Sequence, residues 1–336
     1  DRTQQYSVRV LGGTDIPMLN LRGVTDQAER LERCQRYIDE LTEFTGKLEG
    51  LHSGATDRKN GHVDTEGNVV AFQPGSCVIN YTEISLDSLL YSIPATQAMA
   101  GVRANGSGKA KLNRSMEAAE EMMRLFYQHK GLVDQSDKTV FTDADKAKYG
   151  DKNGLPKGRQ NIRYTDMSGS VFMYAAGNHI GIQYGSCTSM TQTPGVTASA
   201  EGIYEDGYYF GWGLHHEIGH EINQQQYTYA EVTNNYYSQL GQAKDTNEST
   251  RWSDYQVVYD RVTSGLKGMA SGKTGIAMYW QLHLAYDDGF NFKSYGTYAE
   301  QMENLVFARM DAYARNQAIA PQAAEGGTPL VLAGAD

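Results

Sequence analysis

The strongest chemical signal in this sequence is the segment Gly213-Leu214-His215-His216-Glu217-Ile218-Gly219-His220. His216 and His220 are four residues apart, so on a helix they lie one turn apart on one face, where two imidazoles can bind one metal ion. Glu217 follows the first of these histidines, where its carboxylate reaches a water molecule held by the metal without binding the metal itself. The segment therefore predicts a zinc site of the hydrolase type.

The third metal ligand has to come from outside this segment. The longer pattern H-E-x-x-H-x-x-G-x-x-H is excluded, because it needs glycine and histidine where this sequence has Asn223 and Gln226. A glutamate on a second helix is the usual alternative, and it leaves one coordination position for water or substrate. Glu231 is the candidate, since we expect a helix over residues 230–240. Asn235 follows on the same helix face, where its amide can orient a ligand.

The other residues of the histidine helix predict how it is held. Leu214, Ile218 and Ile222 recur every four residues and give an apolar stripe for the core. Gly219 lowers helix stability by about 1 kcal/mol relative to alanine, which indicates close backbone packing. His215 points about 100° away from the first ligand, so we expect it to pack rather than to bind metal. Two surface histidines without a metal are the alternative to this interpretation.

A longer run of residues around the motif has a known counterpart. The run extends over residues 208–224 and 231–238, and three further segments belong with it, at residues 85–91, 173–182 and 278–282. Together these segments resemble the M60-like (enhancin-type) metallopeptidases, whose pattern is HExxH followed at variable spacing by a glutamate. The resemblance covers most of the chain.

The resemblance implies more than the spacing does. It implies a gluzincin-like catalytic domain with Zn²⁺ as its cofactor, in a bacterial peptidase that is secreted or attached to the cell surface. Many bacterial members act on mucin-like, O-glycosylated proteins, so the implied partner is an O-glycosylated protein substrate. Flanking carbohydrate-binding modules in a longer parent chain are also implied.

The composition of the chain limits the class of protein and the kinds of partner. The chain has 336 residues, 40% of them hydrophobic and 21% charged, as in ordinary globular proteins. A net charge of −10 argues against nucleic acid as a partner, and no apolar run reaches the roughly 20 residues of a membrane span. The cysteines Cys34, Cys77 and Cys187 are too few for a disulfide framework and are expected to be buried thiols. The chain starts at Asp1, so we expect a processed form or part of a longer chain.

Hydrophobic periodicity predicts an α+β fold, with a mixed-sheet lobe followed by a mainly helical lobe and the zinc site on the helix between them. We expect one catalytic domain over residues 1–317, with lobes of about 1–205 and 206–317, and a linker or tail at 318–336. The expected helices, some with cap or stop residues, are 25–48 (Thr25 or Asp26), 86–93, 95–102, 116–130 (Ser115, Gly131), 253–266, 275–286 and 298–316. The expected strands are 69–72, 77–81, 171–174 and 178–184, and a charged turn region is expected at 142–158.

The strand at 178–184 is a candidate wall of the substrate cleft. A substrate added to it as a further strand would contact Asn178, His179, Ile180 and Gly181. An ordinary interior strand is the alternative, and for His179 so is a purely structural role.

The expected reaction is hydrolysis of a peptide bond. Zinc held by His216, His220 and Glu231 activates water, and Glu217 moves the proton. Candidates for stabilising the oxyanion are Tyr227, Tyr229, Tyr236, Tyr279, His283 and Tyr295. Two rival functions stay open: a zinc endopeptidase with no glycan requirement, and a non-catalytic glycan-binding surface module. The second is weakened by Glu217, since a closed structural zinc site has no use for a base.

Overall fold

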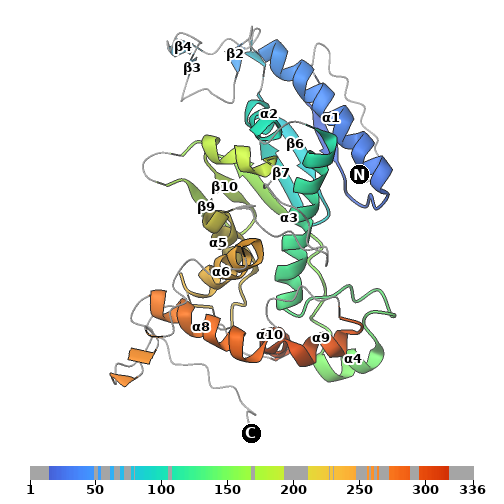
Figure 1. Cartoon of the computed structure of the whole chain (residues 1–336), viewed down its shortest axis with the longest axis vertical. Helices are drawn as coiled ribbons and strands as arrows, with labels where there is room; N and C mark the ends of the chain where they lie inside the picture. Colours follow the sequence, from blue (N-terminus) through green and yellow to red (C-terminus); the bar gives the residue numbers. More distant parts are fainter. Residues whose placement is uncertain are drawn as a thin grey trace, which may run out of the picture.

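The computed structural model of the chain describes residues 15–48, 52–53, 61–63, 69–71, 77–78, 80–104, 108–167, 171–192, 211–226, 228–229, 231–246, 256, 259–260, 263–264, 272–287 and 295–317 (Figure 1). Within these ranges, no helix is both long enough and apolar enough to span a lipid bilayer.

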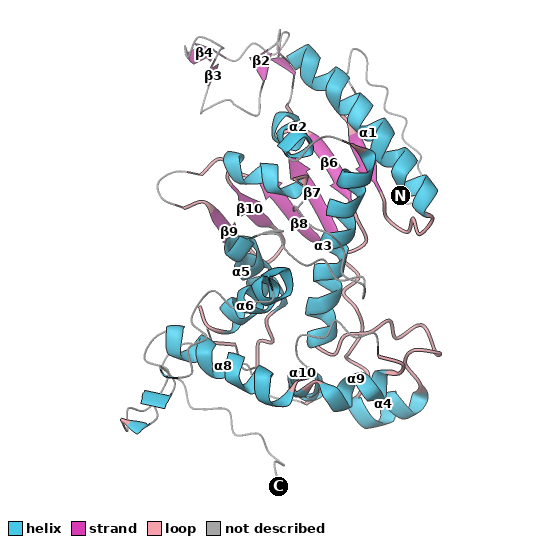
Figure 2. Cartoon of the chain, viewed as in Figure 1, coloured by secondary structure: helices cyan, strands magenta, loops and turns pink. Residues whose placement is uncertain are grey.

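A mixed six-stranded sheet forms the β part of the fold (magenta in Figure 2). Its neighbours run parallel except at β6–β7 and β10–β9, which are antiparallel. In spatial order the strands are β1 (Met18–Asn20), β6 (Thr82–Ser85), β7 (Leu89–Ile93), β8 (Gln160–Tyr164), β10 (Ile180–Ile182) and β9 (Met173–Ala175). Two further strand pairs are β2 (His52–Ser53) with β5 (Cys77–Val78) and β3 (Gly61–Val63) with β4 (Val69–Ala71).

Helices are the other regular elements of the described chain. In sequence order they are α1 (Gln27–Leu48), α2 (Ala95–Ala104), α3 (Lys109–His129), α4 (Asp143–Tyr149), the 3₁₀ helix η2 (Tyr184–Met190), α5 (Gly211–Ile222), α6 (Thr233–Thr246), α8 (Gly272–Tyr286), α9 (Tyr298–Asn304) and α10 (Val306–Asn316). In Figure 1, α5 and α6 lie between the sheet and α8, while α3 runs from the sheet down toward α9 and α10. The predicted α+β architecture is confirmed.

One large hydrophobic core joins the sheet to the helices. It contains the inward side chains of β7, which are Leu89, Tyr91 and Ile93, and the predicted apolar stripe of α5. That stripe, Leu214, Ile218 and Ile222, is buried. Burial of such side chains contributes roughly 1.5–3 kcal/mol each, so α5 is anchored along its whole length on the side away from its histidines.

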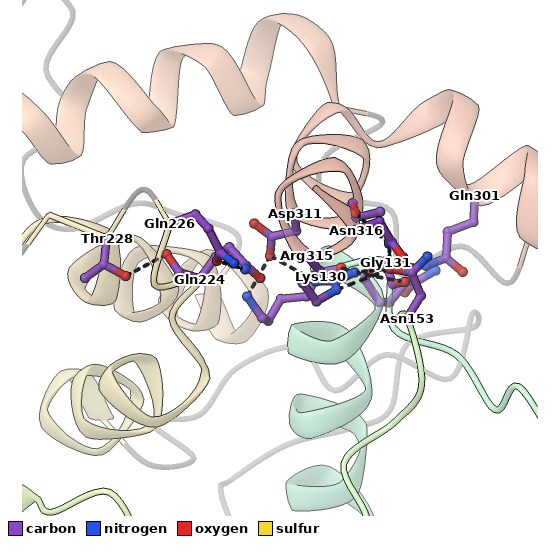
Figure 3. A network of polar contacts seen from close by, with 12 residues as sticks. Lys130, Gly131, Asn153, Gln224, Gln226, Thr228, Gln301, Asp311, Arg315 and Asn316 are labelled. Atoms are coloured by element: carbon purple, nitrogen blue, oxygen red, sulfur yellow. Dashed lines mark hydrogen bonds and ion pairs between the residues drawn. The ribbon is translucent and has the colours of Figure 1, made fainter. Parts of the chain in front are cut away.

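A buried polar network fixes the end of α3 against α10 (Figure 3). Lys130 Nζ donates to Asp311 Oδ2 over 2.6 Å, and both side chains are almost fully buried. Arg315 Nη2 donates to the Lys130 carbonyl over 2.6 Å, so it satisfies a backbone acceptor that helix termini leave free. Gly131, at φ 62°, ends α3 as predicted. The network holds the lower end of α3 in place.

Several other predictions from the sequence are confirmed. Asp26 accepts the backbone N–H of Glu29 at the start of α1, over 2.8 Å. The helix predicted at 95–102 corresponds to α2, and the one at 275–286 to α8. Cys34 and Cys187 are buried free thiols, as expected.

The prediction of a helix over residues 86–93 is wrong. These residues form the turn after β6 and then β7, an interior strand paired with β6 and β8. Leu86, Leu89, Leu90 and Ile93 fit a helical spacing as well as a strand. Pairing on both edges selects the strand, because it satisfies every backbone group of a segment buried in the sheet.

Three further predictions need correction. Residues 142–158 are not all turn, because Thr142 and Asp145 form a capping box that starts α4. Ser115 is not a cap: it is buried inside α3, which begins at Lys109. Residues 298–316 form two helices, since Leu305 is extended (φ −120°, ψ 102°) and Val306 N donates to Asp287 Oδ1.

The helix predicted at 253–266 lies largely outside the described residues. The side chain of Cys77 and the predicted tail at 318–336 also lie outside them.

Candidate metal centre

Helix α5 presents His216 and His220 on one face, as the four-residue spacing predicted. Their Nε2 atoms are 3.2 Å apart. The rings meet edge to face, with an interplanar angle of 85°. One neutral imidazole can donate to the other ring nitrogen at this distance, and a metal ion bound by both nitrogens would bring them equally close. Both nitrogens converge on one point.

Glu231 reaches the same point from outside α5. Its Oε2 lies 3.2 Å from His216 Nε2, and its Oε1 lies 3.4 Å from His220 Nε2. The prediction that Glu231 lies on a helix is wrong, since α6 begins at Thr233. Glu231 instead adopts φ 59°, the sole positive φ among the described residues other than glycine. Such conformations cost about 1–3 kcal/mol and concentrate at functional sites, so the fold holds this carboxylate in place against local strain.

Asn235 lies where the sequence placed it, beside the first histidine. His216 Nδ1 donates to Asn235 Oδ1 over 2.7 Å, which leaves the Nε2 lone pair for a metal. The Asn235 amide also donates to the Glu231 carbonyl over 2.8 Å. Trp212, which the sequence analysis did not single out, donates Nε1–H to the same Oδ1 over 2.9 Å. Its position four residues before His216 on α5 is the signal that could have identified it.

Asn234 is the second residue that the sequence analysis missed. Its Nδ2 lies 3.1 Å from His216 Nε2 and 3.0 Å from His220 Nε2. Its neighbour in space is Gly219, where an added Cβ would lie 2.5 Å from the Asn234 carbonyl oxygen. The close backbone packing predicted for Gly219 is therefore confirmed, and it brings α6 within reach of the histidines.

Glu217 lies beside this centre and is held from the sheet side. The backbone of Ala175 on β9 favours its charged form. A carboxylate oxygen of Glu217 and one ring nitrogen from each of His216 and His220 lie within 4.8 Å of one another. Burial raises the pKa of Glu217, and the nearby His216 lowers it by a smaller amount. A carboxylate with a raised pKa is suited to accepting a proton near neutral pH.

The strand that flanks this centre is β9 rather than the predicted one. β10 lies between β8 and β9 in the sheet, so its backbone is paired on both sides and has no edge for a substrate. Ile180 and Gly181 are buried, and a Cβ at Gly181 would lie 2.3 Å from the Tyr174 ring. The edge strand β9 packs close to α5. A Cβ added at Gly213 of α5 would lie only 3.0 Å from Sδ of Met173 on β9.

His179 and Asn178 belong to the turn between β9 and β10. His179 Nε2 lies 2.9 Å from Tyr174 Oη and 2.9 Å from Arg163 Nη2, and its Nδ1 lies 2.6 Å from Asn178 Oδ1. Both ring nitrogens thus have partners within the chain. The arrangement favours the structural role for His179.

The candidates for stabilising the oxyanion differ in how deeply they are buried. Tyr236 and His283 are buried and lie 3.1 Å apart, Oη to Nδ1, so they face each other rather than an open cleft. Tyr229, Tyr279 and Tyr295 are half-buried, and Tyr227 lies outside the described residues. His215 is buried edge-on against Phe126, with ring centroids 5.7 Å apart, in the packing role expected for it.

These residues fit a catalytic metal. Two imidazoles and one carboxylate are the donor set of catalytic zinc sites, which keep a position open to solvent. The side chains of His216, His220 and Glu231 are 18%, 32% and 64% exposed, so one side of the centre is open. Burial, and then His216, lowers the pKa of His220, which favours the neutral imidazole that a metal binds. The buried Oδ1 of Asn234 has no hydrogen-bonding partner among the described residues.

Comparison with protein families identifies the family of this chain. Residues 110–316 match the family described as peptidase M60, enhancin and enhancin-like, which is more than half of the chain. This chain belongs to the M60 metallopeptidase family. The match includes the whole metal centre, and it confirms both the resemblance and the enzyme class expected from the sequence. No curated protein matches the chain.

Solved structures of M60 enzymes from Clostridium perfringens share the fold. The M60 catalytic domain of ZmpC, solved in complex with the sialyl T antigen, has a TM-score of 0.53 and 17% identity over 92% of this chain and 54% of that one. The ZmpB metallopeptidase has a TM-score of 0.52 and 20% identity over 93% and 56%. The ZmpB catalytic domain solved with its CBM51-1 and CBM51-2 domains has 0.51 and 20%, over 91% and 28%. This chain thus spans about half or less of each.

Proposed function

We propose that this chain is a zinc-dependent endopeptidase whose metal is held by His216, His220 and Glu231 and whose general base is Glu217. The observation that supports this most strongly is the convergence of three donor groups, from α5 and from the segment before α6, at a partly exposed point beside a buried carboxylate. A closed structural site would instead bury its ligands.

Bound at this centre, zinc supplies Lewis-acid chemistry: it acidifies water and polarises a carbonyl. The remaining work belongs to the chain. Glu217 takes the proton of the attacking water and then gives it to the leaving amine nitrogen. The backbone of Ala175 on the edge strand β9 favours the charged carboxylate that takes this proton. An extended substrate is proposed to lie along β9, where it would add a strand to the sheet.

The proposed substrate is an O-glycosylated, mucin-like protein. What supports this is membership of the M60 family together with the relative whose catalytic domain was solved with the sialyl T antigen. By the same reasoning we propose a secreted or cell-surface location, and carbohydrate-binding modules elsewhere in a longer chain. Residues 1–317 are proposed to form one catalytic domain.

A substrate comparison tests the glycan requirement. We expect cleavage of native mucin to be at least about 10-fold faster than cleavage of enzymatically deglycosylated mucin or of casein, because a site that binds a sugar strongly rejects substrates that lack it. Released fragments are measured by mass spectrometry of new peptide termini. Equal rates on all three substrates would leave a zinc endopeptidase without glycan preference, and removal of zinc with a chelator is expected to abolish each rate.

Asn235 provides a test of the metal ligands. In Asn235→Ala, His216 Nδ1 and Trp212 Nε1 lose their acceptor, so we expect zinc affinity to fall by about 10- to 100-fold. Asn235→Asp keeps the acceptor oxygen but loses the donor to the Glu231 carbonyl, so it is expected to lose less affinity than Asn235→Ala. Competition with a chromogenic zinc chelator measures both. Equal affinity in Asn235→Ala and the native chain would contradict the proposed role of this residue.

A further inference from the structure

A second group of potential metal ligands lies behind the catalytic centre. It comprises His129 at the end of α3, His283 on α8, Asp287 directly after α8, and Tyr236 on α6. The side chains of His129, His283 and Asp287 are 3%, 0% and 0% exposed. Tyr236 directly follows Asn235, the residue that orients His216, so α6 contributes to both groups.

The four side chains close a ring of short contacts. Asp287 Oδ2 lies 3.2 Å from His129 Nε2 and 3.4 Å from His283 Nδ1. Tyr236 Oη lies 2.8 Å from the same nitrogen of His129 and 3.1 Å from the same nitrogen of His283. Ligands of a tetrahedral zinc ion, each about 2.0–2.2 Å from the metal, lie at similar distances from one another.

Hydrogen bonding accounts for this ring only in part. Each of the two imidazole nitrogens has a single in-plane hydrogen or lone pair, so it can make one good hydrogen bond. Here each nitrogen has two oxygen neighbours, one from Asp287 and one from Tyr236. A cation inside the ring would use each nitrogen once and both oxygens at the same time.

The charge of the group calls for a cation as well. Asp287 places a carboxylate, 0% exposed, beside ring nitrogens of His129 and His283. Tyr236 adds a buried oxygen beside the same two ring nitrogens. A buried charge is stable when it is paired or bound to a metal. A metal ion among these four groups would pair the carboxylate charge, with Tyr236 bound as the tyrosinate.

The surroundings match those of a structural metal site. Asp287 uses its other oxygen, Oδ1, to accept Val306 N–H over 2.6 Å, which orients the carboxylate. Aromatic rings cover the histidines: Trp280 stacks on His283 at 4.8 Å and Phe307 on His129 at 6.3 Å, centroid to centroid. The site would be closed by protein on all sides, in contrast to the partly exposed centre on α5.

We propose that His129, His283, Asp287 and Tyr236 bind a second zinc ion in a closed, four-ligand site that joins α3, α6 and α8. The ion has a structural role, because the site leaves no position open to substrate. It fixes α6, the helix that also carries Asn234 and Asn235 beside the catalytic histidines.

Counting zinc per chain tests this directly. The purified full chain is loaded with zinc, freed of excess by gel filtration, and measured by mass spectrometry of the metal against protein concentration. We expect two zinc ions per native chain and one in His216→Ala/His220→Ala, which leaves the second group untouched. Loss of all tightly bound zinc in that double variant would overturn the proposal.

Two further measurements locate the retained ion. Adding His283→Ala and Asp287→Asn to the double variant should remove it, and its persistence there would place it elsewhere and overturn the proposal. Cobalt substitution of the double variant needs no change in the second group. We expect the intense d–d absorption of tetrahedral Co²⁺, together with a tyrosinate signal from Tyr236. The weak spectrum of six-coordinate Co²⁺ would contradict the site.

Discussion

Glu217→Gln is expected to lower kcat/KM on a protein substrate by about 10²–10⁴-fold while zinc content and thermal stability stay near native values. The amide has the size of the carboxylate, so the packing around this buried side chain of α5 is kept. It cannot take a proton from water, so the loss falls on the chemical step. Initial cleavage rates and metal content of the same preparation, measured side by side, check this result.

Glu221→Gln is the matched control on the same helix. Glu221 Oε1 accepts Gly177 N–H over 2.7 Å, and a glutamine oxygen can do the same. We expect its kcat/KM to change by less than about 10-fold, since a weaker hydrogen bond is worth about 1 kcal/mol. If Glu217→Gln retained native activity, or if both variants lost activity equally, Glu217 would not be the base.

Gly219→Ala is expected to destabilise the protein by about 1–3 kcal/mol and to weaken the metal centre. An added Cβ would lie 2.5 Å from the Asn234 carbonyl oxygen, which is backbone and cannot turn aside. To restore ordinary contact near 3.5 Å, α6 has to retreat by roughly 1 Å. A displacement of that size at a catalytic site costs on the order of 100-fold in rate, even though alanine favours helix.

Gly46→Ala separates the steric effect from helix propensity. Gly46 lies near the end of α1, and a Cβ there meets no atom of the described chain within 4 Å. This variant is expected to be as stable as the native chain or more stable, by up to about 1 kcal/mol, with unchanged activity. Thermal unfolding and zinc titration of both variants provide the comparison. A native melting temperature and zinc affinity in Gly219→Ala would show that the helices can separate freely.

The parts of the site that follow from local geometry could be predicted from the sequence. Helical periodicity alone puts His216 and His220 on one face and Leu214, Ile218 and Ile222 on another, and the structure has both. A glycine inside a helix lowers the stability of the helix, so Gly219 predicts close packing against another element. These inferences need no knowledge of the rest of the fold.

The parts of the fold and of the site that depend on contacts between distant segments could not be predicted from the sequence. Residues 86–93 fit a helix and a strand equally well, and only pairing with β6 and β8 decides between them. The order of strands in the sheet decides that β9, and not β10, lies at the edge beside α5. Asn234 reaches both histidines because Gly219 admits α6 so closely, which is a property of two elements together.

The position of Glu231 before α6 has an evolutionary consequence. α5 ends at Ile222 and α6 begins at Thr233, and connections between helices tolerate gained or lost residues. Glu231 precedes the helix, so residues gained or lost before it change a loop length and leave the contact between Gly219 and Asn234 intact. Homologues can therefore keep the same pair of helices while the interval from motif to glutamate drifts. A search for relatives should fix the helix contact and leave that interval free.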